Sequence, residues 1–370
     1  MSQTGQTSRT LSTDIFCRVI DNFGDAGVMW RLAKALTDEG LVVRLIIDDI
    51  ETLSHLTAGL KPIAAISEQY RIEVFHWEKS WDAGECPLEP AAFVIEGFGC
   101  RLPANYESKM AQRSPSPLWV NVDYFSAEDW VDVFHMQPSI HPTYGLKKYF
   151  VFPGVSTRSG GLIIEKDYEK EEKTWKASHG HCGPLKLFFF TYPYGPIREL
   201  AQTLAELNLP IQVRCAATQA GQMLYQNINE LNSDRLTAKL LPFVAQESFD
   251  HFLWDCDLAF IRGEDSAARA MIAGVPFIWH IYHQEDNAHQ VKLQALEKKM
   301  SHCFDDTNLF NAWCQFQEGF NNGVVHRDAL KIIVERLDSL RQCSMAWRKK
   351  IHANGSLAQK LSEMAKKTLK

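Results

Sequence analysis

The feature that most constrains the fold of this chain is the alternation of short apolar stretches with segments of helical periodicity. The apolar run 14–20 leads into a glycine turn, a segment with apolar residues at helical spacing over 28–39, and the β-branched run 41–49. The same alternation resumes at 185–192 and continues to 276–282. Strand, glycine turn, helix and strand form the opening unit of a Rossmann-like sheet. The sequence therefore predicts an α/β protein with two Rossmann-like domains that face each other across a cleft.

The length of 370 residues also favours two domains, because one hydrophobic core rarely serves more than roughly 300 residues. Apolar runs continue through the first part of the chain, so we predict an N-terminal domain over 1–155. The polar, charged and glycine-rich stretch 156–184 is predicted to be a linker or an exposed edge, and a second domain is predicted over 185–345. The amphipathic segment 346–370 is expected to form a terminal helix that packs back on the first domain.

Composition and charge are those of an ordinary globular protein. Hydrophobic residues make up 45% of the chain and charged residues 23%, which argues against disorder. The formal net charge of −6 argues against a nucleic-acid binder, which normally has a basic excess. Nine scattered cysteines without a C-x-x-C pair fit reduced thiols, and no apolar run approaches the roughly 18 residues that span a bilayer. Because the N-terminus is polar, we expect a cytoplasmic protein that binds neither nucleic acid nor membrane.

The strongest local motif is a strand that ends at Arg262 and passes at once into a helix with Glu264, Asp265 and Ser266 in its first turn. A helix start offers unpaired N–H groups and a partial positive charge, which suit a diphosphate. Arg262 would add a charge-assisted hydrogen bond and Ser266 a further donor, while a carboxylate could bind sugar or ribose hydroxyls. Open α/β sheets also place ligands at the carboxyl ends of strands. The alternative is that Glu264 and Asp265 only cap the helix, worth about 0.5–2 kcal/mol.

A second motif, at the end of the first strand, brackets a glycine turn with two acids. It runs Asp21, Asn22, Phe23, Gly24, Asp25. One carboxylate could accept a proton from an incoming nucleophile as a general base. The alternative is that Asp25 caps the following helix and Asp21 is an ordinary turn residue. The pattern G-x-G-x-x-G is absent, which argues against a nicotinamide oxidoreductase.

Aromatic residues follow two strands of the second half. Phe190 and Tyr192 follow the first of these strands, and Phe243 and Gln246 follow a later one. Aromatic faces at strand ends can stack a nucleobase, and a glutamine can read its polar edge. The alternative is that the phenylalanines belong to the hydrophobic core.

Histidines near the end of the second half raise the question of a metal. His280, His283 and His289 lie close to Glu285 in the sequence, but their spacing matches neither H-E-x-x-H nor a zinc finger. A G-x-S-x-G turn, which would indicate a serine hydrolase, is also absent. We therefore expect no metal site.

Four segments of the chain, in the same order and spread over most of its length, resemble the elongation-factor-P arginine rhamnosyltransferases. They are 14–36, 141–162, 241–250 and 261–282. Asp123 departs from the family pattern, in which a glutamate precedes the tyrosine. The resemblance implies the glycosyltransferase-B arrangement of the two domains, dTDP-β-L-rhamnose as donor substrate with no cofactor, and an arginine of translation elongation factor P as acceptor, with inversion at the anomeric carbon.

The resemblance also implies a role for each candidate residue. Asp25 corresponds to the base and Asp21 to the second acid of the same loop, whose Asn22, Phe23 and Gly24 would contact substrate. The leaving dTDP would need no metal, because a guanidinium and a helix start can stabilise it. The residues that would bind the donor are Phe190, Tyr192, Phe243 and Gln246 for the thymidine, and Arg262, Glu264, Asp265 and Ser266 for the ribose and diphosphate.

Two alternatives stay open from the residues. The chain could be a glycosyltransferase of the same fold that uses another sugar nucleotide or acceptor. It could also be a module that binds a sugar nucleotide without catalysis. Carboxylates in both halves of the predicted cleft favour catalysis over binding alone.

Overall fold

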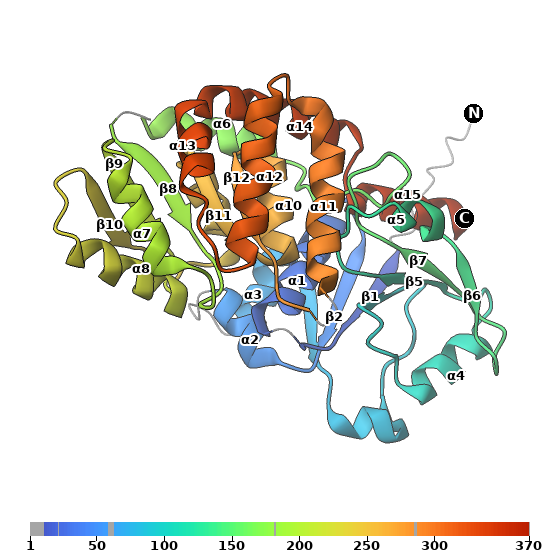
Figure 1. The fold of residues 1–370 in the computed structure, drawn as a ribbon. Coiled ribbons are helices and arrows are strands. Elements are labelled where there is room, and N and C mark those ends of the chain that lie inside the picture. The colour runs from blue at the N-terminus through green and yellow to red at the C-terminus, as the bar shows by residue number, and fades with distance from the viewer. Residues whose placement is uncertain (1–10, 21, 58–62, 181–182, 285–286, 370) are drawn as a thin grey trace, which may run out of the picture.

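Two β-sheets, each enclosed by helices, form the two halves of the molecule in the computed structural model (Figure 1). The residues that the structure describes are 11–20, 22–57, 63–180, 183–284 and 287–369. No helix in these ranges is long and apolar enough to cross a membrane. The cysteines that are described are free thiols.

The first sheet lies in the N-terminal half of the chain. Its strands are β1 (Ser12–Cys17), β2 (Val42–Ile47), β3 (Ile72–His76), β4 (Phe93–Gly97), β5 (Leu118–Val122), β6 (Pro138–Ile140) and β7 (Lys147–Val151). They lie in the order β3-β2-β1-β4-β5-β7-β6, and every neighbouring pair is parallel except β6 and β7. The central strands β4 and β5 are buried along their whole length, as expected for a parallel sheet covered on both faces.

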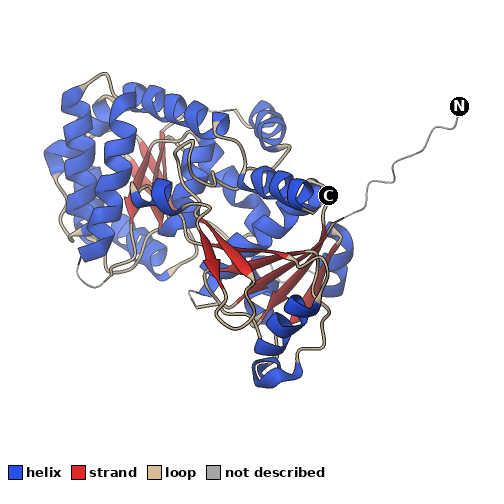
Figure 2. Ribbon diagram, turned by 90° about the vertical axis from the view of Figure 1, so that its right-hand side faces the viewer, coloured by secondary structure: helices blue, strands red, loops and turns tan. Residues whose placement is uncertain are grey.

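Helices cover both faces of the first sheet. They are α1 (Asn22–Asp38), α2 (Ile50–Leu56), α3 (Ile63–Tyr70), the π turn η1 (Trp81–Glu85), α4 (Ala104–Gln112), α5 (Trp130–Phe134) and, from the end of the chain, α15 (Leu357–Thr368). On one face Leu32 and Leu36 of α1 share a core with Leu357 and Leu361 of α15. A separate cluster around Tyr106 of α4 fills the other face. Figure 2 accordingly shows the C-terminal end of the chain beside the first sheet.

The second sheet has five parallel strands. They are β8 (Leu185–Phe189), β9 (Ile211–Cys215), β10 (Leu236–Leu240), β11 (Leu258–Arg262) and β12 (Phe277–His280). Their order is β10-β9-β8-β11-β12. In both sheets the first three strands lie in reverse order and the fourth joins the other side of the first, which is the Rossmann order. The structure therefore confirms the predicted α/β class with two Rossmann-like sheets.

The second half also carries helices on both faces of its sheet. They are α6 (Tyr168–Ser178), α7 (Ile197–Glu206), α8 (Gln219–Glu230), the 3₁₀ turn η2 (Gln246–Ser248), α9 (Phe249–Trp254), α10 (Gly263–Ala273), α11 (Ala288–Met300), the 3₁₀ turn η4 (Ser301–Cys303), α12 (Thr307–Asn321), α13 (Arg327–Glu335) and α14 (Leu337–Ala353).

The stretch 156–184, expected to be a linker or edge, contains α6, whose Tyr168 is buried. The terminal stretch 346–370 is not one helix, because Gly355 with a left-handed φ of 81° separates α14 from α15. The domain boundaries themselves stay predictions.

Side chains of α12 bond to the outer backbone groups of β12, the edge strand of the second sheet. The Trp279 N–H donates to Gln317 Oε1 at 3.0 Å, and the Ile281 N–H donates to Asn321 Oδ1 at 2.9 Å. Asn321 Nδ2 in turn donates to the Trp279 carbonyl at 2.8 Å. Residues at this spacing lie on one face of a helix, so the two amides act in place of a further strand. These bonds fix β12 to α12, and the other edge of β12 pairs with β11, which ends at Arg262.

Replacing Asn321 with alanine tests this arrangement. The substitution leaves a buried N–H and a buried carbonyl of the edge strand without partners, so we expect the free energy of unfolding to fall by about 2–4 kcal/mol. Urea denaturation followed by tryptophan fluorescence measures the change. Gln315→Ala, at an exposed position of the same helix, is the control and should change stability by less than about 0.5 kcal/mol. A loss in Asn321→Ala no larger than in the control would contradict the arrangement.

Candidate functional site

Asp25 lies in the first turn of α1, shortly after β1, and its carboxylate is held from two sides. The residue is buried, with 1% of its surface exposed. The Ile20 N–H donates to Oδ2 at 2.8 Å, and the Tyr124 hydroxyl donates to Oδ1 at 2.8 Å. Asp25 is therefore more than a cap of α1, because its carboxylate also bonds to the segment that follows β5. Asp21 and the side chain of Asn22 lie outside the described residues.

The first two turns of α1, where the sequence predicted a glycine turn, contact the second half of the chain. Phe23 is 40% exposed, and its ring centroid lies 6.0 Å from that of Phe243. Gln246 Nε2 donates to the Gly27 carbonyl of α1 at 2.8 Å. A Cβ on Gly27 would lie only 2.8 Å from this nitrogen, so a larger residue there would displace the Gln246 amide. Phe243 and Gln246, both predicted for the thymidine, thus lie at the start of α1, where Gly24 is also exposed.

Arg262 lies against two of the aromatic side chains predicted for the thymidine. Its guanidinium carbon is 4.6 Å from the ring centroid of Phe190 and 5.0 Å from that of Tyr192. Such cation–π contacts orient a guanidinium. The half-exposed ring of Tyr282 lies edge-on to Tyr192, with centroids 5.6 Å apart. The structure therefore places Arg262, predicted for the diphosphate, in contact with Phe190 and Tyr192, predicted for the thymidine.

The N-terminus of α10 carries the remaining donor-site candidates. Glu264 pairs with Lys292 of α11 at 3.2 Å. Asp265 lies 3.8 Å from the Arg31 guanidinium of α1. Ser266 is nearly buried, with 9% of its surface exposed. The two carboxylates are thus paired with cations from different halves of the molecule, and the start of α10 lies against α1.

Buried ion pairs join α1 to the second half. Arg31, which is 2% exposed, donates to Glu165 Oε1 at 2.7 Å, and Arg269 donates to Glu165 Oε2 at 2.8 Å. Arg269 also donates to Asp250 at 2.9 Å. Burial by itself would raise the pKa of the Glu165 carboxyl, but the guanidinium groups of Arg269 and Arg31 outweigh burial and lower this pKa to about 2. A charged Glu165 therefore links α1 to α10.

His280 lies behind the aromatic residues and is fully buried. Its Nδ1 accepts a hydrogen bond from the Tyr192 N–H at 3.3 Å. Burial, together with the nearby His283, Arg262 and His289, lowers the pKa of His280 to about 3. The imidazole is therefore neutral near pH 7, and its Nδ1 is able to accept this bond.

The other histidines of this region pack on one another. The ring centroids of His283 and His289 are 4.7 Å apart. Glu285 lies outside the described residues. Within the described ranges, no three His, Cys, Asp or Glu side chains are grouped so that they could hold a metal. A metal-free reaction stays a prediction.

Comparison with known proteins identifies the family. The model of the elongation factor P (EF-P) rhamnosyltransferase family EarP matches residues 13–366. This chain belongs to the EarP family. A protein-arginine rhamnosyltransferase from Pseudomonas putida is 35% identical over 381 residues, which cover 96% of this chain and 99% of the relative. One from Neisseria meningitidis is 32% identical and covers 95% and 96% of the two chains.

Solved structures agree in fold with this EarP family member. An EarP structure reported as the basis for EarP-mediated arginine glycosylation of translation elongation factor EF-P has a TM-score of 0.59 and 21% identity, and covers 97% of this chain and 99% of its own. MurG from Acinetobacter baumannii has a TM-score of 0.52 and 14% identity, and covers 96% and 99%. The glycosyltransferase-B arrangement expected from the sequence is thereby confirmed.

Four residues at the site of this EarP family member were missed by the sequence analysis. Tyr124 and Tyr282 follow β5 and β12, and the carboxyl ends of parallel strands are places where ligands bind. The same rule that selected Arg262 could have found them. Arg31 and Glu165 are separated by 134 positions, and no local pattern pairs them.

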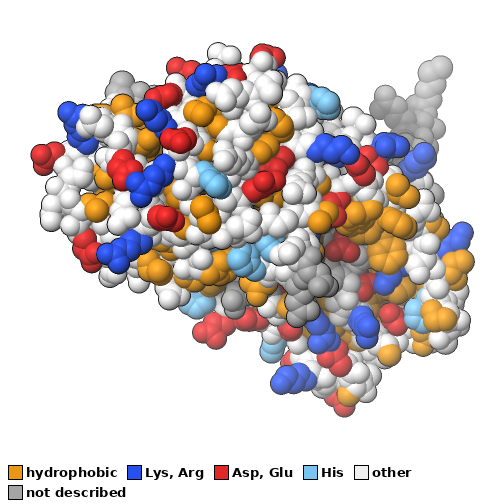
Figure 3. All heavy atoms as spheres, in the orientation of Figure 1, with side chains coloured by type: hydrophobic (Ala, Val, Ile, Leu, Met, Phe, Trp, Pro, Cys, Tyr) orange, Lys and Arg blue, Asp and Glu red, His pale blue; other side chains and the backbone are white. Residues whose placement is uncertain are grey.

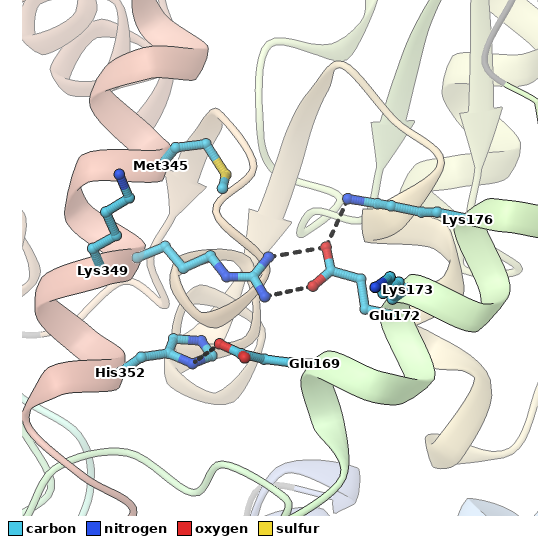
Figure 4. Close-up of a pocket in the computed structure, with 8 residues that line it drawn as sticks. Glu169, Glu172, Lys173, Lys176, Met345, Lys349 and His352 are labelled. Atoms are coloured by element: carbon cyan, nitrogen blue, oxygen red, sulfur yellow. Dashed lines mark hydrogen bonds and ion pairs between the residues drawn. The ribbon is translucent and has the colours of Figure 1, made fainter.

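A separate groove lies between α6 and α14 (Figure 4). It has a volume of about 590 Å³, and its lining residues come from these two helices. Glu172 accepts a hydrogen bond from Arg348 at 2.9 Å, and Glu169 lies 3.2 Å from His352. Acids of α6 thus contact the guanidinium of Arg348 and the imidazole of His352 on α14. The candidate site residues lie on other elements, so this groove is not part of the site.

Glu165→Gln tests the ion pairs between the halves of this EarP family member. Removing the carboxylate leaves two buried guanidinium groups short of a partner, so we expect a loss of about 3 kcal/mol in unfolding free energy at pH 7. Because the folded pKa of about 2 lies below the ordinary 4.5, the difference from wild type is complete above pH 4.5 and shrinks as the pH falls towards 2. Urea denaturation at pH 7 and pH 3 measures it. Glu230→Gln, at the exposed end of α8, is the control, and a pH-independent difference would refute the assignment.

Proposed function

We propose that this protein transfers L-rhamnose from dTDP-β-L-rhamnose to an arginine side chain of elongation factor P, with inversion and without a metal. One observation carries the proposal. A buried carboxylate on α1, Asp25, and an aromatic-bound guanidinium, Arg262, lie in opposite halves that meet at α1 and the start of α10. The acceptor is a translation factor, so the proposed location is the cytoplasm.

The donor fits the second half. The N–H groups at the start of α10, with Ser266 and Arg262, would hold the diphosphate. Phe243, Phe190 and Tyr192 would border the thymidine. Gln246 Oε1 is a buried acceptor without a partner in the described structure, and the N–H of a thymine ring would supply one. This unpaired oxygen supports a thymine or uracil nucleotide.

The acceptor chemistry fits the first half. A guanidinium has a pKa above about 12, so a carboxylate does not deprotonate it in the ground state. Asp25 would instead hold the arginine by charge-assisted hydrogen bonds and take the proton as the N–C bond forms. The C–O bond to the diphosphate breaks on the opposite face of the sugar, and Arg262 with the α10 helix start stabilises the departing charge.

A protein acceptor also needs a docking surface. Hydrophobic side chains gather over α5 and the β6–β7 hairpin on the face shown in Figure 3. Val133, Phe134 and Ile140 are 64%, 54% and 63% exposed. Contiguous apolar surface of this kind is typical of protein contacts. It lies on the same half as Asp25, which supports an acceptor that is a protein.

Mass spectrometry of elongation factor P incubated with the protein and dTDP-β-L-rhamnose tests the function. We expect the mass of one deoxyhexose on one arginine, with EDTA making no difference. Asp25→Ala should abolish transfer and leave dTDP affinity within about twofold, because the acid contacts the acceptor and not the nucleotide. Transfer of another sugar, or to another acceptor only, would favour a different glycosyltransferase. Binding of dTDP without any turnover in the wild type would favour a non-catalytic module.

Calorimetry of Glu264→Ala and Asp265→Ala separates donor contacts from helix stabilisation. If these carboxylates bind hydroxyl groups of the donor, each variant should bind dTDP-β-L-rhamnose about 10-fold more weakly. A carboxylate on the ribose weakens dTDP equally, whereas a carboxylate on the rhamnose leaves dTDP affinity unchanged. Asp234→Ala, an exposed aspartate of the same half, is the control. If the affinities for dTDP-β-L-rhamnose and for dTDP are both unchanged, Glu264 and Asp265 serve only the structure of the protein.

A further inference from the structure

Three neighbouring strands of the first sheet end around the Asp25 carboxylate. β1, β4 and β5 are adjacent in the sheet and parallel, so their carboxyl ends lie at one edge. The segment after β1 supplies Asp25, and the segment after β5 supplies Tyr124, whose hydroxyl donates to Oδ1 at 2.8 Å. The segment after β4 supplies Phe98, whose ring is stacked on that of Tyr124 with centroids 4.2 Å apart and planes 14° apart.

The backbone that carries Phe98 is strained. Phe98 has a φ of 54°, and Gly99 follows with a φ of 64°. A bulky aromatic residue rarely adopts the left-handed region, and such residues occur where the surrounding structure imposes them, often at functional sites. Here the Phe98 N–H donates to the Val122 carbonyl at 2.8 Å, and the Gly99 N–H donates to Asn121 Oδ1 at 2.7 Å. The end of β5 therefore fixes the ring on which Tyr124 lies.

The same segment fixes the backbone of Tyr124. The Tyr124 N–H donates to Asp123 Oδ1 at 2.8 Å, and Asn121 Nδ2 donates to Asp123 Oδ2 at 3.4 Å. Asn121 is 1% exposed. One buried amide thus supports both the Phe98 turn and the start of the Tyr124 segment.

Burial distinguishes the two partners of the Tyr124–Asp25 hydrogen bond. Tyr124 is 39% exposed as a residue. Asp25 is 1% exposed, and a buried carboxylate depends on donors from the protein. The bond therefore serves the carboxylate more than the tyrosine. Together with the Ile20 N–H on the other oxygen, it fixes the plane of the carboxylate.

We propose that Tyr124 is a positioning residue for Asp25, and that Phe98 holds the Tyr124 ring in place for this purpose. The inference rests on the proposed function, in which Asp25 receives the acceptor arginine. A guanidinium binds a carboxylate best when both groups lie in one plane. A carboxylate of fixed orientation holds the guanidinium in the reactive geometry. A carboxylate that rotates holds the guanidinium in that geometry for only a fraction of the time.

Tyr124→Phe removes the hydroxyl and keeps the ring. We expect kcat to fall by about 10-fold with the donor KM unchanged, because the bond acts on the acid and not on the nucleotide. The buried carboxylate loses one donor, so the melting temperature should fall by a few degrees at most. Tyr225→Phe is the control, since Tyr225 is a partly exposed tyrosine on α8, away from the residues assigned to either substrate. It should change none of these values. An unchanged kcat in Tyr124→Phe, or a loss of kcat accompanied by an equal weakening of the donor KM, would overturn the proposal.

Phe98→Leu removes the stack and keeps the hydroxyl. We expect a smaller loss of kcat than in Tyr124→Phe, because the phenol becomes free to rotate away from Asp25. The double variant should lose no more than Tyr124→Phe, within about twofold, since both changes act through one hydrogen bond. If the kcat of the double variant falls by the product of the two single losses, Phe98 acts independently of the Tyr124 hydrogen bond. If the wild type transfers no rhamnose, the proposed function fails. If it transfers rhamnose and Tyr124→Phe matches it, only this inference fails.

Discussion

The shared carboxylate of Glu165 holds the two halves of the molecule in the arrangement on which the site depends. Arg31 of α1 and Arg269 of α10 bind this one carboxylate, so the two helices cannot separate without breaking a buried charge pair. Breaking such a pair costs about 3–5 kcal/mol, because the remaining charge is left without a partner. Helix α1 therefore contributes both to the candidate site and to the contact between the two halves. Its first turn carries Asp25, and about 9 Å further along its axis Arg31 anchors it to the donor side.

The fold was predictable because its determinants are local. Apolar runs, glycine turns and helical periodicity follow directly from neighbouring residues, and they placed both Rossmann-like sheets. The failures have a local cause as well. The stretch 156–184 is polar on average, but α6 needs only one face to bury Tyr168, so its exposed face dominated the composition. The break at Gly355 was missed because both flanking segments are amphipathic helices with compatible periodicity.

The candidate site was predictable in part, for the same reason. Parallel strands end at one edge of a sheet, so strand ends pointed to Asp25, Phe190 and Arg262 as candidates, and the family resemblance supplied their expected roles. Which side chains meet there is decided by tertiary packing. The hydroxyl of Tyr124 reaches Asp25 across 99 positions of sequence. The left-handed backbone of Phe98 opposes the preference of an aromatic residue, and such conflicts between local preference and structure are expected at functional sites.

Two arginines of the second half differ in the groups that surround their guanidinium. Arg269 is bonded to Asp250 and Glu165, so its charge is compensated within the protein. Arg262 instead lies against the rings of Phe190 and Tyr192, which orient a guanidinium but have no net charge to neutralise it. Its guanidinium lies beside the start of α10, where the helix dipole is also positive. In the proposed function, these two positive groups in fixed positions would stabilise the departing diphosphate.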